Sequence, residues 1–210
     1  MTNVIEQLAQ HRIVPVIALD KVSQAAPLAE ALVEGGLPVA EVTFRTAAAA
    51  ESIKIMAERG DMIVGAGTVL TIDQAKEAVD NGATFLISPG INPKVVKYCV
   101  DNNIIITPGI SNPTDIELAL DLGLKVVKFF PAEAVGGLPL LKAVAAPYNM
   151  MNFIPTGGIN ANNVTKYLEF DKVLACGGSW MVAPSLYEAG DFSKVVELTK
   201  EAVAVAASVK

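Results

Sequence analysis

The sequence predicts an α/β fold, a (β/α)8 TIM barrel that begins with a short N-terminal helix. Apolar runs of about four to eight residues alternate along the chain with amphipathic stretches of about ten to fifteen, a pattern typical of strands alternating with helices. Eight such pairs fit within 210 residues, and barrels of this kind need about 200 residues or more. The composition is 52% hydrophobic but only 6% aromatic. Aliphatic side chains must therefore fill the core, as they do around buried parallel strands.

The expected strands and helices alternate in eight pairs. Strands are expected at Ile13–Leu19, Val39–Phe44, Ile63–Thr68, Phe85–Ser88, Ile104–Pro108, Lys125–Phe130, Asn152–Pro155 and Lys172–Cys176. Helices are expected at Ala25–Glu34, Ala48–Arg59, Ile72–Asn81, Pro93–Asn102, Pro113–Leu122, Leu138–Ala145, Asn162–Glu169 and Phe192–Ser208. A further short helix over Thr2–Gln10 would cross the bottom of the barrel.

Helix boundaries carry residues that favour them. Gly35, Gly82 and Gly123 each stand just before an expected strand, and glycine readily ends a helix. Thr71 and Asn112 precede expected helices, where their side chains can accept hydrogen bonds from the first turn. An open, doubly wound sheet is the alternative fold, but no GxGxxG motif with a downstream acidic partner supports it. One barrel domain over residues 1–210 is therefore expected.

Charge and composition bound the partners. The net charge of −6 argues against nucleic acid or an anionic membrane surface. No apolar run approaches the roughly 20 residues that a membrane-spanning helix needs, and the polar start lacks a signal-peptide pattern, which favours a cytoplasmic location. Cys99 and Cys176 lie far apart in apolar segments, so we expect reduced core residues. With nucleic acid and membranes disfavoured, we expect a small molecule as the ligand.

Charged residues fall inside or directly after two of the expected strands. Glu41 and Arg45 have the same parity on the second strand, and side chains of one parity share one face. Lys128 stands between Val127 and Phe129 on the sixth strand, and those two apolar residues suit the helix side. The sequence therefore predicts that all three charged side chains point toward the barrel axis, where the loops after the strands form the active site.

Burying a lysine and a glutamate is costly unless they pair, lose their charge or react. A purely structural ion-pair network of Glu41, Arg45 and Lys128 is one interpretation, but perturbed charged groups cluster at functional sites. A neutral lysine amine can attack a ketone and, after loss of water, leave a protonated Schiff base that withdraws electrons. Glu41 is then the expected general acid and base. Arg45, assisted by the Thr68 hydroxyl, would bind a substrate carboxylate.

Glycines at the ends of the last two strands form the other half of the expected site. Gly157, Gly158, Gly178 and Ser179 come just before expected helices. Glycine lets backbone N–H groups approach an anion closely, and helix N-termini favour negative charge. Phosphate sites in these barrels are frequently built from the loops after strands seven and eight. The sequence therefore predicts a phosphate-binding site at this position.

Several segments, in the same order over essentially the full length, resemble the 2-dehydro-3-deoxy-6-phosphogluconate aldolase and 4-hydroxy-2-oxoglutarate aldolase family. The most specific of these segments is Lys128-Phe129-Phe130-Pro131-Ala132-Glu133. The others are Val14–Ile17, Glu41–Thr46, Gly65–Leu70, Ile87–Gly90, Pro108–Ser111, Pro155–Ile159 and Gly177–Trp180.

The resemblance implies a class I aldolase that needs no cofactor and no metal. It implies that Lys128 forms the Schiff base and Glu41 moves protons, while Arg45 and Thr68 hold the keto-acid carboxylate. It also implies that Gly157, Gly158, Gly178 and Ser179 hold the phosphate and that Pro89 and Phe130 line the pocket. The implied substrate is a phosphorylated 2-keto sugar acid, and the implied assembly is a homotrimer.

Three other functions are open at this point. A metal-dependent class II aldolase would need a cluster of ligands, whereas His11 is the one histidine of the chain and stands before the first strand. A phosphosugar isomerase or epimerase could use Glu41 as a base without an imine. A non-catalytic barrel could bind a phosphorylated ligand and release no product.

Overall fold

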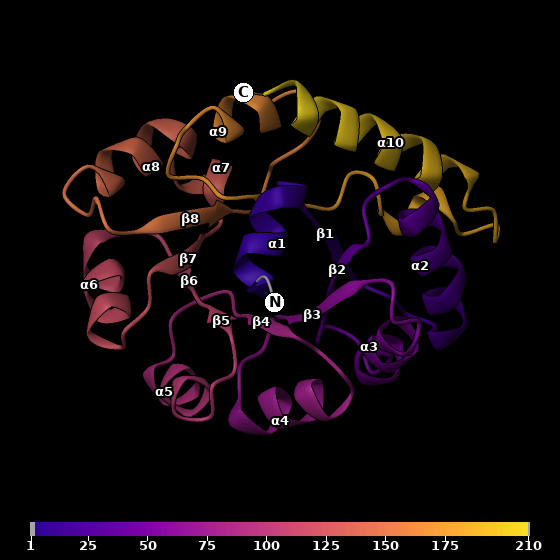
Figure 1. Ribbon diagram of the computed structural model, residues 1–210, viewed down its shortest axis with the longest axis horizontal. Helices are drawn as coiled ribbons and strands as arrows, with labels where there is room; N and C mark the ends of the chain where they lie inside the picture. Colours follow the sequence, from indigo (N-terminus) through magenta and orange to yellow (C-terminus); the bar gives the residue numbers. More distant parts are fainter. Residues whose placement is uncertain (1–2, 210) are drawn as a thin grey trace.

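The computed structural model describes residues 3–209 and has the predicted (β/α)8 barrel, with helices surrounding a curled parallel sheet (Figure 1). Its strands are β1 Ile13–Ile17, β2 Val39–Thr43, β3 Ile63–Gly67, β4 Phe85–Ile87, β5 Ile106–Thr107, β6 Gly109–Ile110, β7 Val126–Phe129, β8 Asn152–Pro155 and β9 Cys176–Gly178. Its α-helices are α1 Val4–His11, α2 Ala25–Glu34, α3 Ala49–Glu58, α4 Ile72–Asp80, α5 Pro93–Asp101, α6 Pro113–Asp121, α7 Ala132–Val135, α8 Gly137–Ala145, α9 Val164–Leu168 and α10 Ser193–Ser208.

The strands pair in parallel around a closed ring. One run has the order β5-β4-β3-β2-β1-β9 and the other has the order β6-β7-β8. The two runs meet at Pro108, which separates β5 from β6 because proline has no N–H to give to a ladder. They meet again where Thr156 and Gly177 form a parallel bridge between the ends of β8 and β9. The ring therefore contains eight strand positions, one of which is interrupted.

Local sequence explains several of the helix boundaries. Thr71 and Asn112 accept hydrogen bonds from the N–H groups of Gln74 and Asp115, as the sequence predicts for N-caps. Asn3 and Glu6 form a reciprocal capping box at the start of α1. Helix α1 ends at His11, and the predicted start at Thr2 lies outside the described residues.

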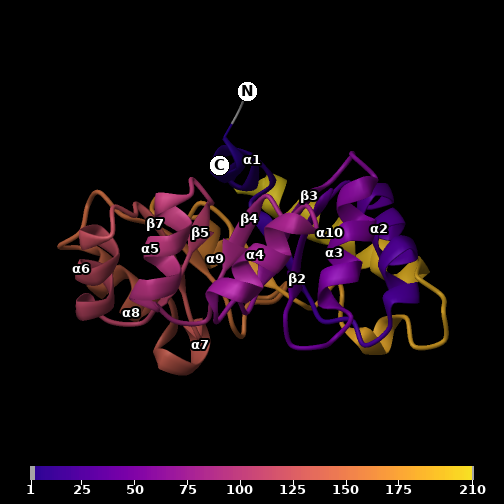
Figure 2. The same cartoon turned by 90° about the horizontal axis from the view of Figure 1, so that it is seen from below.

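The two ends of the barrel differ in what covers them. Helix α1 lies over the end at which the strands begin, and α7, which follows β7, lies at the opposite end (Figure 2). Within residues 3–209, none of the helices combines the length and apolar character required to cross a lipid bilayer. The C-terminal end of the strands is thus free of α1, which leaves it open for a site.

Some predicted boundaries are wrong for physical reasons. The last strand was expected at Lys172–Cys176 but lies at Cys176–Gly178. Glycine is uncommon in strands, yet here a side chain at Gly177 would collide with Thr156. The short helix α7 was not expected because four residues carry no helical periodicity. Gly35 ends α2 with ordinary helical angles, and Gly36, with φ of 83°, takes the left-handed conformation instead.

Arg12, just before β1, connects the start of the barrel to helices α9 and α10. Its guanidinium donates to the Leu168 carbonyl at 2.8 Å and to the Val209 carbonyl at 2.6 Å, at the ends of α9 and α10. We expect Arg12→Ala to lower the free energy of unfolding by about 2 to 3 kcal/mol, because charge-assisted hydrogen bonds at helix C-termini are lost. Urea denaturation followed by circular dichroism measures the change.

Arg59→Ala is the matched control for this prediction. Arg59 pairs with Asp61 at 2.9 Å, but the two side chains are 30% and 46% exposed. An exposed ion pair of this kind contributes less than about 1 kcal/mol. Equal losses of stability in the two variants would contradict the role of Arg12.

Candidate active site

A cavity of about 320 Å³ lies at the C-terminal end of the strands. The ten residues that the sequence singles out all line it, from strands or loops that are distant in the chain. They are Glu41, Arg45, Thr68, Pro89, Lys128, Phe130, Gly157, Gly158, Gly178 and Ser179. Four residues that were not proposed also line it: Val16, Thr43, Thr156 and Ile159. The strand ends thus converge on one concave site, as the barrel topology predicts.

Lys128 and Glu41 form the charged centre of the cavity. Lys128 Nζ lies 3.5 Å from Glu41 Oε1, and the two side chains are only 7% and 1% exposed. The ammonium also lies over the ring of Phe130, 4.9 Å from its centroid, within the range of a cation–π contact. The neighbours Val127 and Phe129 belong to the hydrophobic core. The strand alternation therefore places Lys128 in the cavity and its apolar neighbours elsewhere.

Glu41 is a buried carboxyl group with few partners. Neither of its oxygens accepts a hydrogen bond from any of the described residues. Burial raises the pKa of Glu41, and the positive charges of Lys128 and Arg45 oppose that rise without cancelling it. A carboxyl group with a raised pKa and free acceptor positions is suited both to take and to return a proton.

The position of the Glu41 carboxyl group depends on a glycine in the next strand. Strand β3 pairs with β2, and Gly67 has no side chain between the two. A Cβ atom at Gly67 would lie 2.8 Å from Glu41 Cγ and 2.9 Å from Glu41 Cδ. Real Cβ atoms essentially never come this close, so the carboxyl group would have to move.

Because the sequence predicts that Glu41 is the general acid and base, we expect Gly67→Ala to lower kcat by about 100-fold, the effect of displacing such a group by about 1 Å. The variant should stay folded, because Gly67 does not have a positive φ. Steady-state kinetics of product release measure the change. Gly90→Ala is the matched control, because a Cβ there meets nothing within 4 Å. Near-normal kcat in Gly67→Ala would contradict this account of Glu41.

Arg45 does not lie on a strand, which corrects one expectation. Strand β2 ends at Thr43, so the alternation that orients Glu41 does not extend to Arg45. Arg45 stands in the following turn, is exposed, and still lines the cavity. Its Nε donates to Thr43 Oγ1 at 3.0 Å, and that hydroxyl donates to the Ile17 carbonyl at 2.7 Å. Thr43 therefore fixes the guanidinium at the rim of the cavity. Thr43 has the same strand parity as Glu41, and this could have indicated that its side chain faces the cavity.

Thr68 and Pro89 complete the wall next to Arg45. Thr68 is half-buried and has a φ of 57°. This left-handed conformation is unusual for a β-branched residue, and such strain is found preferentially at functional sites. Thr68 follows β3 directly, and Pro89 comes two residues after the end of β4, so both lie at the same edge of the sheet as Arg45.

The glycine turn after β8 forms the opposite wall. Gly157 and Gly158 have φ of 102° and 79°, angles that side chains rarely adopt. Helix α9 begins only at Val164, so the amides of Gly157 and Gly158 belong to a turn and not to a helix N-terminus as expected. Backbone N–H groups of such a glycine turn at a cavity wall are suited to an anion.

Other charged residues near the site have different surroundings. Glu133 is a second carboxylate after β7, but its Oε1 accepts a hydrogen bond from the Tyr167 hydroxyl on α9. Lys125 is exposed at the start of the same strand. His11 ends α1 at the other end of the barrel, and burial lowers its pKa. In residues 3–209, no three His, Cys, Asp or Glu side chains are grouped to hold a metal ion.

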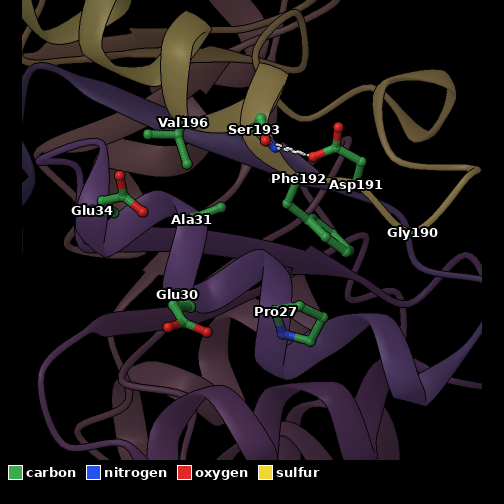
Figure 3. A pocket seen from close by; sticks show the side chains of 9 residues that line it. All are labelled: Pro27, Glu30, Ala31, Glu34, Gly190, Asp191, Phe192, Ser193 and Val196. Carbon is green, nitrogen blue, oxygen red and sulfur yellow. Dashed lines mark hydrogen bonds between the residues drawn. The ribbon is translucent and has the colours of Figure 1, made fainter.

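A second pocket, of about 440 Å³, lies between α2 and the start of α10 (Figure 3). Glu30 and Glu34 on α2 face Asp191 and Phe192 across it, and Asp191 accepts a hydrogen bond from Ser193. This pocket is larger than the one around Lys128, but its lining combines carboxylates with no lysine or arginine among the described residues. It has no counterpart to the buried lysine–glutamate pair that the smaller cavity contains.

Comparison with known proteins points to one family. The family model described as KDPG and KHG aldolase matches residues 4–198. A 2-dehydro-3-deoxy-phosphogluconate aldolase from Treponema pallidum is 48% identical over 206 residues, which cover 98% of either chain.

Solved structures give the same result. A Zymomonas mobilis 2-keto-3-deoxy-6-phosphogluconate aldolase with 3-phosphoglycerate superposes with a TM-score of 0.90 at 42% identity, covering 98% of this chain and 96% of that one. A Legionella pneumophila KDPG aldolase, with pyruvate captured as a covalent carbinolamine intermediate, superposes with a TM-score of 0.91 at 36% identity. That match covers 95% of this chain and 97% of the Legionella chain.

Proposed function

Because this chain belongs to the KDPG and KHG aldolase family, we propose that it is a class I aldolase. Its main reaction would be the reversible cleavage of 2-dehydro-3-deoxy-6-phosphogluconate to pyruvate and glyceraldehyde 3-phosphate. The observation that carries the proposal is the buried Lys128 amine, 3.5 Å from a carboxyl group whose oxygens are otherwise unpaired. An amine and an acid–base group at this separation are the two parts that Schiff-base chemistry needs.

Lys128 acts first, as the nucleophile. Its neutral amine attacks the C2 ketone, the ketone oxygen is protonated, and water leaves to give an iminium ion on Nζ. The iminium withdraws electrons from the C3–C4 bond. The Phe130 ring beside Nζ is a surface that accommodates a cation without neutralising it.

Glu41 moves the protons. Its carboxylate takes the proton of the C4 hydroxyl, the C3–C4 bond breaks, and the bonding electrons pass into an enamine while glyceraldehyde 3-phosphate leaves. Glu41 then returns a proton to C3, either directly or through one water. Hydrolysis of the resulting iminium releases pyruvate and frees Lys128. The raised pKa of Glu41 suits a group that must both accept and donate in one cycle.

The remaining residues orient the substrate. Arg45 and Thr68 would bind the C1 carboxylate, through a planar guanidinium and a hydroxyl. The amides of Gly157 and Gly158, with Gly178 and Ser179 from the end of β9, would bind the phosphate at the opposite wall. Pro89 and Phe130 would pack on the carbon chain between them. The cavity lining supports this arrangement. Arg45 and Thr68 follow β2 and β3, the glycine turn follows β8, and Lys128 stands on β7.

We propose 4-hydroxy-2-oxoglutarate as a second substrate, cleaved to pyruvate and glyoxylate. It has the same 2-keto acid and C4 hydroxyl as the phosphorylated substrate, so Lys128 and Glu41 can perform the same steps. It lacks the phosphate and gains nothing from the glycine turn. We therefore expect a higher KM for this compound.

Reductive trapping tests the proposal. Incubation with pyruvate and sodium borohydride should give a stable adduct on Lys128 with the mass of pyruvate less one oxygen atom, detected by mass spectrometry of peptides. Cleavage of 2-dehydro-3-deoxy-6-phosphogluconate should persist with a chelator present. An isomerase or epimerase forms no such adduct, and a non-catalytic barrel releases no pyruvate. Loss of activity on chelation would instead indicate a metal-dependent aldolase.

A homotrimer and a cytoplasmic location remain predictions from the family resemblance and the sequence. Light scattering after size-exclusion chromatography tests the first, since one chain has a mass of 22.0 kDa.

A further inference from the structure

The two carbonyl groups of the glycine turn are both held from outside the cavity. The Gly157 carbonyl accepts the N–H of Glu133 at 3.0 Å. The Gly158 carbonyl accepts two side-chain amides, from Asn160 at 3.1 Å and from Asn163 at 3.0 Å. The Gly157 carbonyl shares its peptide plane with the Gly158 N–H, and the Gly158 carbonyl shares its plane with the N–H of Ile159, which lines the cavity. Holding the two carbonyls therefore orients these two N–H groups.

Asn163 is the central member of this arrangement. Its Nδ2 donates to the Gly158 carbonyl, and its Oδ1 accepts the Asn160 N–H at 2.8 Å. Asn160 in turn holds the N–H of Asn162 through its own Oδ1 at 2.9 Å. One asparagine side chain thus joins both ends of the segment Gly158–Asn163. No aspartate or alanine could make the same pair of contacts, because only an amide is both donor and acceptor.

The turn needs this support because glycine is flexible. Gly157 and Gly158 lose more conformational freedom on ordering than any other residue type would. An anion site made of backbone amides in this turn is effective only if the N–H groups are oriented before the ligand arrives, since ordering them on binding would reduce the affinity. The Glu133 N–H fixes the plane of the Gly158 N–H. The Asn160 and Asn163 amides fix the plane of the Ile159 N–H, from a position outside the cavity lining.

We propose that Asn163, together with Asn160, is a positioning residue that sets the preference for phosphorylated over unphosphorylated substrates. This inference rests on the proposed function, because it assigns the phosphate to the glycine turn. The two asparagines do not touch the reacting atoms. They act by fixing the peptide plane between Gly158 and Ile159, and with it the Ile159 N–H, while Lys128 and Glu41 carry out the bond cleavage in either case.

The test compares 2-dehydro-3-deoxy-6-phosphogluconate with the same compound lacking the phosphate. In Asn163→Ala, KM for the phosphorylated substrate should rise about tenfold, the effect expected when the hydrogen bonds that orient a binding group are lost. KM for the unphosphorylated substrate, kcat for both, and the rate of borohydride trapping with pyruvate should all stay within about twofold of the wild type. Asn163→Asp, which keeps the acceptor but loses the donor, should show the same selective rise.

Asn162 supplies the matched control. It lies in the same turn and is exposed, and its side chain makes no hydrogen bond within residues 3–209. Asn162→Ala should leave both KM values unchanged. Asn162→Asp adds the same charge as Asn163→Asp without removing the donor, so it separates charge from positioning.

The outcomes distinguish the two levels of inference. A wild-type enzyme that cleaves neither compound contradicts the proposed function, and one that cleaves both with equal KM contradicts the phosphate site. A wild type that prefers the phosphorylated substrate, with the preference unchanged in Asn163→Ala, overturns the role of Asn163 alone. Equal losses with both substrates indicate general damage to the fold and also overturn it.

Discussion

Replacing Lys128 by alanine should lower the rate of pyruvate release by about 10⁴-fold or more, since the nucleophile of a covalent mechanism is removed. The barrel should remain folded. The substitution leaves Glu41 buried without its partner, but burial already raises the pKa of Glu41, so this carboxyl group can take up a proton and become neutral. Pyruvate release coupled to lactate dehydrogenase measures activity, and circular dichroism checks the fold.

Lys125→Ala is the control for this variant. Lys125 immediately precedes β7 and is exposed, so it should keep wild-type turnover and wild-type trapping by borohydride. Retention of near-normal cleavage by Lys128→Ala, or trapping of pyruvate on another lysine in the wild type, would exclude Lys128 as the nucleophile.

Replacing Glu41 by glutamine should lower kcat by about 10² to 10⁴-fold, the range that general acid–base catalysis provides. The side chain keeps its size and Lys128 keeps its amine, so borohydride should still trap pyruvate, although more slowly. Single-turnover kinetics separate imine formation from carbon–carbon cleavage in this variant. A normal rate of cleavage would contradict the assignment.

The pH dependence follows from the direction of the shift. Burial raises the pKa of Glu41 above that of an exposed glutamate, so the carboxylate needed as a base forms only at higher pH. The acid limb of the kcat/KM profile of the wild type should therefore rise through this raised pKa as pH increases, and Glu41→Gln should lack that limb. A wild-type limb at the ordinary glutamate pKa would indicate another base.

Glu133→Gln tests the competing carboxylate. Glu133 accepts a hydrogen bond from Tyr167, and glutamine keeps an acceptor at that position. We expect kcat and the acid limb of Glu133→Gln to match the wild type. A loss of kcat as large as that of Glu41→Gln would indicate that Glu133 transfers the protons instead.

The sequence predicts the centre of the site better than its edges, for a physical reason. Alternation along a strand depends only on neighbouring residues, so Lys128 between Val127 and Phe129 could be assigned a direction without knowing the fold. Arg45 lines the cavity as predicted, but it was wrongly given the parity of a strand that ends at Thr43, because strand ends depend on pairing with another strand. The late start of β9 at Cys176 has the same cause.

Contacts between residues that are distant in the chain could not be predicted from the sequence. Gly67 lies inside the expected strand Ile63–Thr68, and nothing in the sequence marked its role. That role depends on the register, which pairs Gly67 with Thr43 and so brings it against the side chain of Glu41, two residues earlier in β2. Asn160 and Asn163 were similarly hidden inside an expected helix over Asn162–Glu169 and the loop before it. Their pairing with the Gly158 carbonyl requires the turn to be in place. Spacing along a chain does not determine such contacts.

The one-sided placement of Glu41 has a stereochemical consequence. Its carboxyl group lies at the β2–β3 wall, in the space that Gly67 leaves open, while Lys128 approaches from β7. With the carboxylate and phosphate ends of a substrate anchored, only one configuration at C4 directs its hydroxyl toward that wall. Run in reverse, the same asymmetry would present one face of an incoming aldehyde to the enamine. The new carbon–carbon bond would then form with a defined handedness, a property that chiral chromatography of the aldol product can measure.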